Sequence, residues 1–342
     1  MKKYFLLACA FCAFGVADAA TIQFSSPDKK LQVTVADDGG RPTYRVVCGE
    51  TVFLEQSPLG LLTNIGDFSQ GMTLQESSFS SSPVSGHYEL PTIKRSKVDV
   101  RATKAVCPFY KDGKHIFDVV FHVSDHDVAF KYKMYPQGNT LCCVVKEETT
   151  GFVLPQGTTT FLCPQAGPMG GFARTSPSYE TSYTADGEMG KNGWGNGYTF
   201  PCLFRTGNKG WVLISETGVD SRYCASRLMG KDGGLYTIGF PQEGEYNGNG
   251  TACPGIALPG ETPWRTVTVG QTLAPIVETT IPYDVVEPLY EPSRRYVYGR
   301  GTWSWIIAGD NSMNYDEQKR YVDFAADMGY ESVLVDAWWD SR

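Results

Sequence analysis

An acidic side chain followed by tryptophans stands near the end of the sequence. Asp336 comes directly after the apolar run 332–335, and Trp338 and Trp339 follow it. Carboxylates bind sugar hydroxyls through charge-assisted hydrogen bonds, and indole faces pack against the apolar faces of pyranose rings. The pattern therefore favours carbohydrate binding by Asp336 and Trp338. In an alternative that stays open, Asp336 caps a loop or helix and the tryptophans pack between domains.

A second aromatic cluster lies at residues 300–305, which read Arg-Gly-Thr-Trp-Ser-Trp. Trp303 is a further candidate for substrate binding, although Trp303 and Trp305 could equally fill the interior of a barrel. Cleavage of a glycosidic bond needs two carboxylates, one on each side of the bond. Residues 1–342 hold no recognisable pair of catalytic carboxylates, so no catalytic residue is assigned.

The elements that would position these residues form a strand–helix–strand unit. A strand is predicted over 298–307, and Asn314 is predicted to cap a helix with Glu317 at its third position. Small or apolar residues then recur at helical spacing as far as Gly329, at 322, 325 and 326. Residues 332–335 are typical of a buried parallel strand. Asp336 would thus lie at the C-terminal end of a strand, where (β/α)₈ barrels build their active sites.

Residues 288–342 are too few for a whole barrel, which takes about 250 residues. Pro288, Pro292 and the charged run 293–295 are typical of a linker before it. A parallel strand with unpaired edges is also a poor natural terminus. We therefore expect the sequence to be a fragment or an interrupted reading frame, with the barrel incomplete.

Residues 20–287 predict a mainly β domain of packed antiparallel sheets, because strand patterns follow one another without helical periods. Residues 44–47 and 51–54 predict a hairpin around Gly49. The other predicted strands are 31–35, 97–102, 116–123, 128–134, 158–163, 210–215 and 265–269. Residues 78–82, rich in serine, and 244–250, rich in glycine, are predicted surface loops.

The N-terminus predicts export. Lys2 and Lys3 precede the apolar run 4–16, and Ala17-Asp18-Ala19 is a small-x-small cleavage pattern, so residues 1–19 have the anatomy of a signal peptide. The run is too short to span a bilayer. A periplasmic protein is expected. The run 6–9, which ends at Cys9, resembles a lipobox and leaves a lipoprotein anchor as the less favoured alternative.

Charge and cysteine content exclude other classes. The net charge is −7 without a basic block, so nucleic acid is not an expected partner. Ten cysteines include two in the predicted signal peptide, and the other eight show no metal-binding spacing. We expect most of those eight to be buried as small apolar residues. Their pairing and the oligomeric state stay open.

Short pieces spread along the chain resemble glycoside hydrolase family 97. The matching pieces, in order, are 26–28, Tyr44, 57–60, 128–132, 147–152, 211–216, 263–265, Glu278, 287–288, 299–305 and 334–336. Each piece is short, but their order and spacing cover nearly the whole mature chain. Lys131 departs from the arginine expected there.

The resemblance implies an exported α-glucosidase or α-galactosidase, with an N-terminal β-super-sandwich on a catalytic (β/α)₈ barrel and calcium in the active site. Its acid and its base or nucleophile come from later barrel strands, beyond residue 342. The run 335–338 (Val-Asp-Ala-Trp) is more similar to the strand end of retaining α-galactosidases than to the Glu-Gly-Trp of inverting α-glucosidases. A retaining α-galactosidase is therefore favoured. The alternatives are an inverting α-glucosidase and a non-catalytic carbohydrate-binding sandwich.

The same resemblance implies a glutamate of the sandwich domain that reaches the calcium. Glu180, flanked by Tyr179 and Tyr183, is the best match, since calcium prefers carboxylate oxygens. An ordinary loop acid is the open alternative for Glu180. Glu216 is second choice, because its place at a strand end favours a structural role.

Overall fold

The computed structural model describes residues 19–165, 182–242, 245, 252–336 and 339. Residues 1–18 of the predicted signal peptide therefore lie outside the described residues, as do Glu180 and Trp338. The chain divides into two compact units, one up to residue 287 and one from residue 288, and each is described by itself. In the described part of the chain, no helix is long and apolar enough to cross a membrane.

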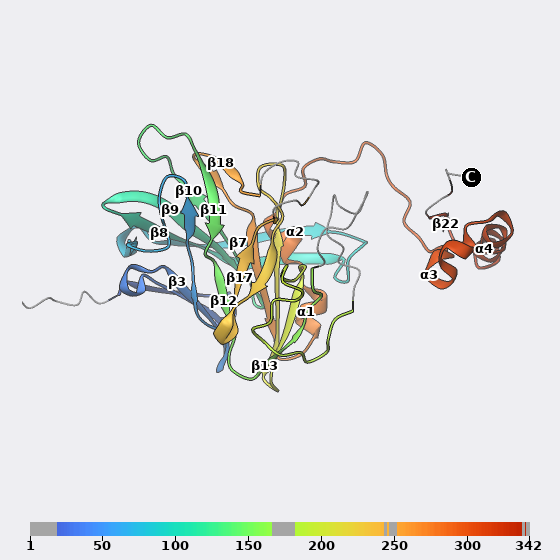
Figure 1. Ribbon diagram of the computed structural model, residues 1–342, viewed down its shortest axis with the longest axis horizontal. Coiled ribbons are helices and arrows are strands. Elements are labelled where there is room, and N and C mark those ends of the chain that lie inside the picture. Colours follow the sequence, from blue (N-terminus) through green and yellow to red (C-terminus); the bar gives the residue numbers. More distant parts are fainter. Residues whose placement is uncertain (1–18, 166–181, 243–244, 246–251, 337–338, 340–342) are drawn as a thin grey trace, which may run out of the picture. The chain divides into compact units, whose positions relative to one another are not determined.

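The first unit begins with a four-stranded antiparallel sheet in the order β1-β2-β3-β4 (Figure 1). Its strands are β1 (Thr21–Ser25), β2 (Leu31–Ala36), β3 (Thr43–Cys48) and β4 (Thr51–Pro58). Leu31, Val33 and Val35 are fully buried, as period-two alternation requires of a sheet with one face in the core. The predicted hairpin is confirmed, because β3 pairs with β4 around Gly49.

A ten-stranded sheet forms the body of the first unit, with the main order β13-β14-β15-β20-β10-β9-β8-β6; β19 pairs with β10 and β7 pairs with β8. Its strands are β6 (Thr73–Leu74), β7 (Ser80–Glu89), β8 (Lys97–Lys111), β9 (Lys114–Val123), β10 (Asp127–Met134), β13 (Thr158–Phe161), β14 (Cys202–Thr206), β15 (Gly210–Thr217), β19 (Gly260–Glu261) and β20 (Trp264–Gly270). All the strands predicted in this region are present.

Two three-stranded sheets complete the sandwich, in the orders β18-β11-β5 and β12-β17-β16. Their strands are β5 (Leu61–Thr63), β11 (Cys142–Glu148), β12 (Gly151–Val153), β16 (Arg227–Gly230), β17 (Leu235–Gly239) and β18 (Gly255–Ala257). One continuous apolar core joins the sheets. Rings meet across it, as where Tyr44 and Phe130 lie 5.0 Å apart. Two short helices, α1 (Ala274–Glu278) and α2 (Ile281–Val285), follow the last strand.

The second unit is a strand–helix–strand motif. Strands β21 (Gly301–Trp303) and β22 (Ser332–Leu334) pair in parallel, and α3 (Trp305–Ala308) and α4 (Tyr315–Asp327) lie between them in the chain. The Asn314 side chain accepts a hydrogen bond from the Glu317 amide at 3.0 Å, so the predicted cap is confirmed. The prediction of a mainly β super-sandwich followed by the start of a β/α barrel is confirmed as well.

The serine-rich loop predicted at 78–82 is wrong from Ser80 onward. There β7 begins and pairs with β8 over its full length, from Ser80↔Val106 to Glu89↔Lys97. Nearly all its side chains are exposed, so the sequence carries no apolar alternation to signal a strand. The strand forms because its backbone pairs with the long strand β8, and not because of its side-chain pattern.

Three further expectations are corrected. Only Gly301–Trp303 of the predicted strand 298–307 is extended, because α3 starts immediately after Ser304. The pair β21–β22 is only partly buried: α4 packs against both strands, and Thr302 is 7% exposed, but Leu334 is 51% exposed. Of the eight mature cysteines, three are buried, at positions 107, 143 and 202. Cys142 points outward because neighbouring β11 residues alternate between the two faces of the sheet.

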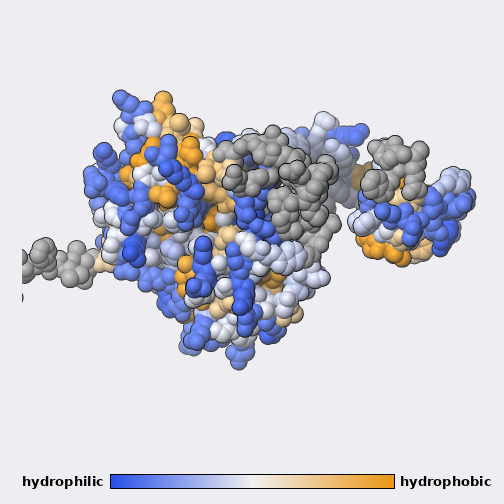
Figure 2. Space-filling model, in the orientation of Figure 1, coloured by the Kyte–Doolittle hydropathy of each residue, from blue (hydrophilic) through white to orange (hydrophobic). Residues whose placement is uncertain are grey.

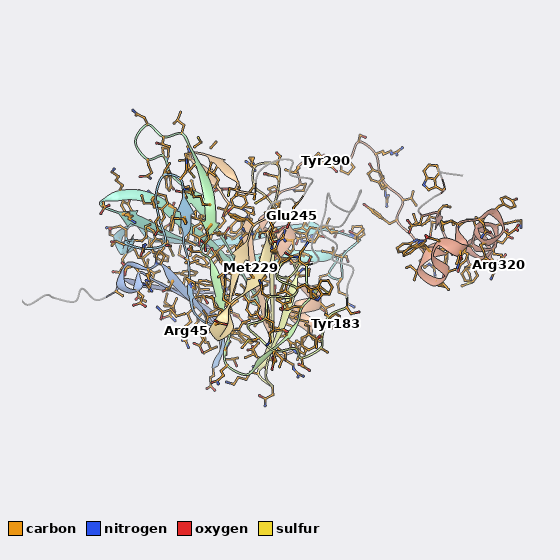
Figure 3. The ribbon with its side chains drawn as sticks, in the orientation of Figure 1. Arg45, Tyr183, Met229, Glu245, Tyr290 and Arg320 are labelled. Atoms are coloured by element: carbon orange, nitrogen blue, oxygen red, sulfur yellow. The ribbon has the colours of Figure 1, made fainter. Side chains whose placement is uncertain are left out.

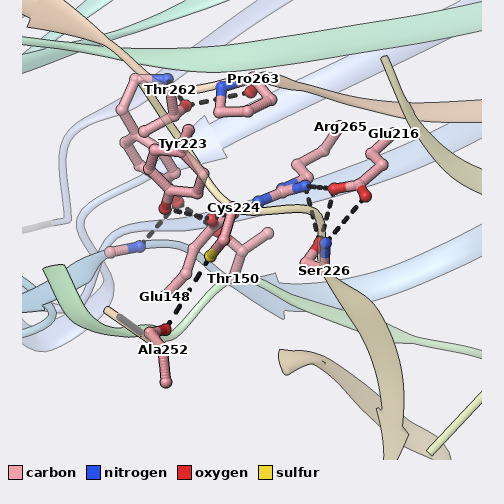
Figure 4. A network of polar contacts seen from close by, with 12 residues as sticks. Glu148, Thr150, Glu216, Tyr223, Cys224, Ser226, Ala252, Thr262, Pro263 and Arg265 are labelled. Atoms are coloured by element: carbon pink, nitrogen blue, oxygen red, sulfur yellow. Dashed lines mark hydrogen bonds and ion pairs between the residues drawn. The ribbon is translucent and has the colours of Figure 1, made fainter. Parts of the chain in front are cut away.

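A buried ionic network ties three strands of the first unit together (Figure 4). Arg265 of β20 donates to Glu148, at the end of β11, through Nε (2.8 Å to Oε1) and Nη2 (2.6 Å to Oε2). Its Nη1 donates to Glu216 of β15 and, at 3.0 Å, to Ser226 Oγ. Tyr223 donates to Glu148 at 3.0 Å. Burial by itself lowers the pKa of Arg265, but the charge and hydrogen bonds of Glu148 and the charge of Glu216 raise it above its usual value.

This network predicts a large loss of stability for Arg265→Met. Removing one partner leaves Glu148 and Glu216 as uncompensated charges in the interior, which costs about 3–5 kcal/mol of unfolding free energy. Denaturant unfolding at neutral pH measures it. Arg45→Met is the control, since Arg45 lies 3.6 Å from Glu55 in an exposed pair and should change stability by less than about 1 kcal/mol. Equal losses in the two variants would contradict the structural role of the network.

Candidate functional site

The structure brings two of the predicted site residues together in the second unit. Trp303 is the last residue of β21, and Asp336 lies two positions after the end of β22. Because the strands are parallel and adjacent, their C-terminal ends share one edge. There Trp303 Nε1 donates to Asp336 Oδ2 at 2.9 Å. Trp303 and Asp336, named separately as candidates from the sequence, are therefore neighbours, while their binding of substrate stays a prediction.

The loop after β21 is fixed to helix α4. Ser304 and Ser312 are fully buried, and their hydroxyls lie 3.0 Å apart. Gln318 Nε2 donates to Ser304 Oγ at 2.7 Å and to the Ser312 carbonyl at 2.8 Å. The loop also presents Trp305, 40% exposed, whose indole N–H donates to Asp310 at 3.2 Å. The hydrogen bonds among Ser304, Ser312 and Gln318 thus fix the backbone between Trp303 and Trp305.

This edge offers a carboxylate beside half-exposed indoles. Among the described residues, Trp303 is the group that donates to Asp336, and it does so at Oδ2. The other oxygen, Oδ1, can accept a sugar hydroxyl, since a carboxylate accepts several hydrogen bonds. Trp339 is 71% exposed nearby in the sequence. The arrangement can hold and orient a sugar, but one carboxylate cannot supply both the acid and the base of hydrolysis.

The two candidate calcium ligands differ. Glu180 lies outside the described residues. Glu216 accepts from Arg265 and from both the amide (2.9 Å) and hydroxyl (2.6 Å) of Ser226, so its oxygens serve the ionic network. In the part of the chain that the structure describes, no three His, Cys, Asp or Glu side chains form a metal-binding group.

Lys131, the departure from the expected arginine, is also part of the scaffold. Its Nζ lies 2.6 Å from Glu261 Oε2 and 4.5 Å from the centre of the Trp264 ring. The ion pair with Glu261 of β19 and the cation–π contact with Trp264 of β20 fix the side chain of this β10 residue. The structure therefore accounts for Lys131 without a ligand.

A polar cavity of about 410 Å³ lies where the turn between β9 and β10 meets α1. Burial raises the pKa of Asp127 and of Asp284 on its wall. Thr268 and Thr279 donate to Asp127 at 2.6 Å each, and Tyr88 donates to Asp284 at 2.6 Å. These carboxylates are thus engaged by internal hydrogen bonds, which favours a structural role.

A second cavity, of about 320 Å³, was missed by the sequence analysis. It lies beside β13, and Trp194, Glu188 and Lys191 contribute to its wall. The signal was present in the sequence: residues 190–197 are glycine-rich around a single tryptophan. A glycine-rich run predicts a loop but not the exposure or surroundings of a side chain in it, so the sequence alone does not place Trp194 at a cavity.

The sequence of the chain is similar to one family of proteins and to two proteins of known name. Residues 24–288 match the glycosyl-hydrolase 97 N-terminal family. A probable retaining alpha-galactosidase of Streptomyces bingchenggensis is 31% identical over 92% of this chain and 45% of its own length. A retaining alpha-galactosidase of Bacteroides thetaiotaomicron is 23% identical over 99% of this chain and 53% of its own length.

Solved structures extend the comparison. A beta-arabinopyranosidase is 53% identical with a TM-score of 0.86, over 94% of this chain and 51% of that protein. A family 97 enzyme of Pseudoalteromonas sp. strain K8, solved with panose, shares the fold at 20% identity and a TM-score of 0.72, over 93% of this chain and 48% of its own. The chain thus spans about half the length of these relatives.

The sandwich and these matches define the N-terminal part of a glycoside hydrolase family. The chain belongs to glycoside hydrolase family 97, and residues 24–288 are the N-terminal domain of that family.

The pair at the strand ends predicts a specific NMR change. The Trp303 indole proton should move upfield in Asp336→Ala, because it loses a charge-assisted hydrogen bond to the carboxylate. Trp303→Phe assigns the signal in a ¹⁵N-resolved spectrum. The Trp305 indole, bonded to Asp310, is the internal control and should not move. An unchanged Trp303 signal would show that the contact is not formed in solution.

Proposed function

We propose that the chain is the N-terminal half of a retaining exo-glycosidase that removes terminal α-D-galactopyranosyl residues. The observation that carries the proposal is the relative named a probable retaining alpha-galactosidase, 31% identical over 92% of the chain. The Asp-x-x-Trp order at 336–339, at the end of a parallel strand, supports it. In the proposal, Asp336 binds substrate hydroxyls and Trp303 orients its carboxylate.

A second candidate activity is hydrolysis of β-L-arabinopyranosides. It is favoured by the 53% identity to a beta-arabinopyranosidase. The two substrates are stereochemically alike, because β-L-arabinopyranose is α-D-galactopyranose without its exocyclic hydroxymethyl group. One site can therefore accept both rings, and the pocket around that group decides between them. A site that hydrogen-bonds this hydroxyl would discriminate strongly against the smaller sugar.

The acid and the nucleophile are proposed to lie beyond residue 342. Retention needs two carboxyl groups about 5–5.5 Å apart on either side of the bond. Asp310 accepts from Trp305 within the loop after β21, whereas Asp336 is the carboxylate that accepts from Trp303 at the strand ends. Its role in the proposal is therefore binding, and the 342-residue chain alone is expected to be inactive.

The full-length protein should hydrolyse p-nitrophenyl α-D-galactopyranoside and release the α-anomer of galactose first, as proton NMR can show. First-formed β-galactose would contradict a retaining mechanism. Comparing kcat/KM with that for the β-L-arabinopyranoside decides which ring is preferred. A preference for α-glucosides with inversion would favour the inverting α-glucosidase. The 342-residue chain is the control, and turnover by it would contradict the proposed location of the catalytic pair.

Calcium, with Glu180 among its ligands, is the proposed cofactor. Glu180→Gln in the full-length protein removes a charged ligand, so activity should fall and should recover partly as calcium is raised. Asp336→Asn loses charge-assisted hydrogen bonds, each worth roughly 1.5–3 kcal/mol, so kcat/KM should fall about ten- to a hundredfold at every calcium concentration. Calcium titrations of both variants measure this. A Glu180→Gln variant that matches the wild type throughout would leave Glu180 as an ordinary loop acid.

A further inference from the structure

A tightly held loop of the first unit exposes one large aromatic side chain. Trp194 lies in the glycine-rich run 190–197 and is 63% exposed. The loop folds back on Asn192, whose carbonyl accepts from the amides of Gly195 (2.9 Å) and Gly197 (3.3 Å). The Asn192 side chain in turn accepts from the Gly230 amide of β16 at 3.1 Å. The position of Trp194 is therefore set by the backbone around it.

The glycines allow this close fit. Gly193 has a φ of +55°, and a Cβ there would lie 2.8 Å from the Gly197 carbonyl oxygen. Gly197 has a φ of +81°, and its Cβ would lie 2.5 Å from the sulfur of Met229, a β16 residue labelled in Figure 3. Small residues thus press the loop onto the sheet, while the single bulky side chain stays in water. Single exposed apolar residues are common on protein surfaces, so Trp194 is a candidate because it lines a cavity and not because it is exposed.

The loop forms one side of the 320 Å³ cavity beside β13. Hydroxyl groups of Thr160, Ser182 and Thr184 contribute to the other sides. Glu188 and Lys191 lie 3.2 Å apart and are both strongly exposed. The volume falls within the roughly 300–1,000 Å³ of small-molecule sites. Hydroxyls, a balanced ion pair and an indole therefore meet in one small depression.

This chemistry fits a neutral, polyhydroxylated ring. The indole face can pack on the C–H face of a pyranose, and Glu188 and Lys191 can bind its hydroxyls through charge-assisted hydrogen bonds. A phosphate or nucleotide would need unbalanced positive charge, whereas the cation here is matched by an anion. On the face of the first unit that Figure 2 shows, hydrophilic and hydrophobic residues are intermixed.

We propose that this cavity is a pyranose-binding subsite with Trp194 as its stacking platform. The inference rests on the proposed function for its class of ligand, a terminal pyranoside. It assigns sugar contacts to the sandwich domain in addition to the edge at Asp336. Because the loop is fixed by backbone hydrogen bonds, little ordering is needed on binding, which favours affinity.

The test is a titration of the 342-residue chain with methyl α-D-galactopyranoside and methyl β-L-arabinopyranoside, followed by the indole signals of its seven tryptophans. Trp194→Phe identifies the Trp194 signal, which should shift saturably with sugar. Trp194→Ala should weaken binding, measured by saturation transfer to the sugar, by at least about threefold, and Trp194→Phe should retain most of it. Tyr290→Ala is the control, because Tyr290 is 80% exposed and is not among the residues that line the cavity.

An unmoved Trp194 signal with both sugars, or undiminished saturation transfer in Trp194→Ala, would overturn the subsite. If Trp194→Ala fails to fold, Glu188→Gln replaces it, since the amide keeps the shape and loses the charge; it should bind severalfold more weakly. The measurement involves no turnover, so it is separate from the test of hydrolysis. A full-length enzyme without α-galactosidase activity would refute the proposed function and leave a sugar-responsive Trp194 standing.

Discussion

The first unit depends on one buried guanidinium. Arg265 is 1% exposed, and a charge in such a place is stable only with paired charges and satisfied hydrogen bonds. Glu216 is its direct cross-strand neighbour in the β15–β20 pair, and Glu148 reaches it from β11. A one-residue slip of β20 would turn Arg265 to the opposite face of the sheet. The register of the central strands and the approach of the smaller sheet are therefore linked in one network, around which the apolar core closes.

Much of this architecture could be predicted from local sequence, because strands with one buried face alternate with period two. The hairpin around Gly49, strands such as β9 and β10, and the Asn314 cap were all accessible in this way. Strand β7 was not, since its polar side chains carry no pattern and its partner strand alone determines it. The ionic network was equally hidden: Glu148 and Arg265 lie far apart in the sequence, and nothing local links them.

The candidate site residues also differ in whether local sequence could predict their surroundings. Trp303 and Asp336 could be predicted as neighbours because parallel strands bring their C-terminal ends to one edge. Trp194 could not, because its exposure depends on how glycines seat a loop against β16. Sugar contacts on the sandwich would mean that both units of the chain take part in recognition. The likeness to relatives that act on galactosides and arabinopyranosides then becomes chemically simple, since the two rings present the same hydroxyls and differ at one exocyclic carbon.

Strand β7 has a consequence for the behaviour of the chain among its own copies. Among the described strands it pairs with β8 alone, so within that part of the chain the other side of this ten-residue strand has no partner strand. Such an edge invites a strand from another molecule and is a common start of aggregation. Pro83 lies within it, opposite Thr103, and has no N–H to donate. A proline in mid-strand and largely exposed, serine-rich side chains make this edge a poor template for strand pairing. They therefore disfavour edge-to-edge aggregation of the protein at high concentration.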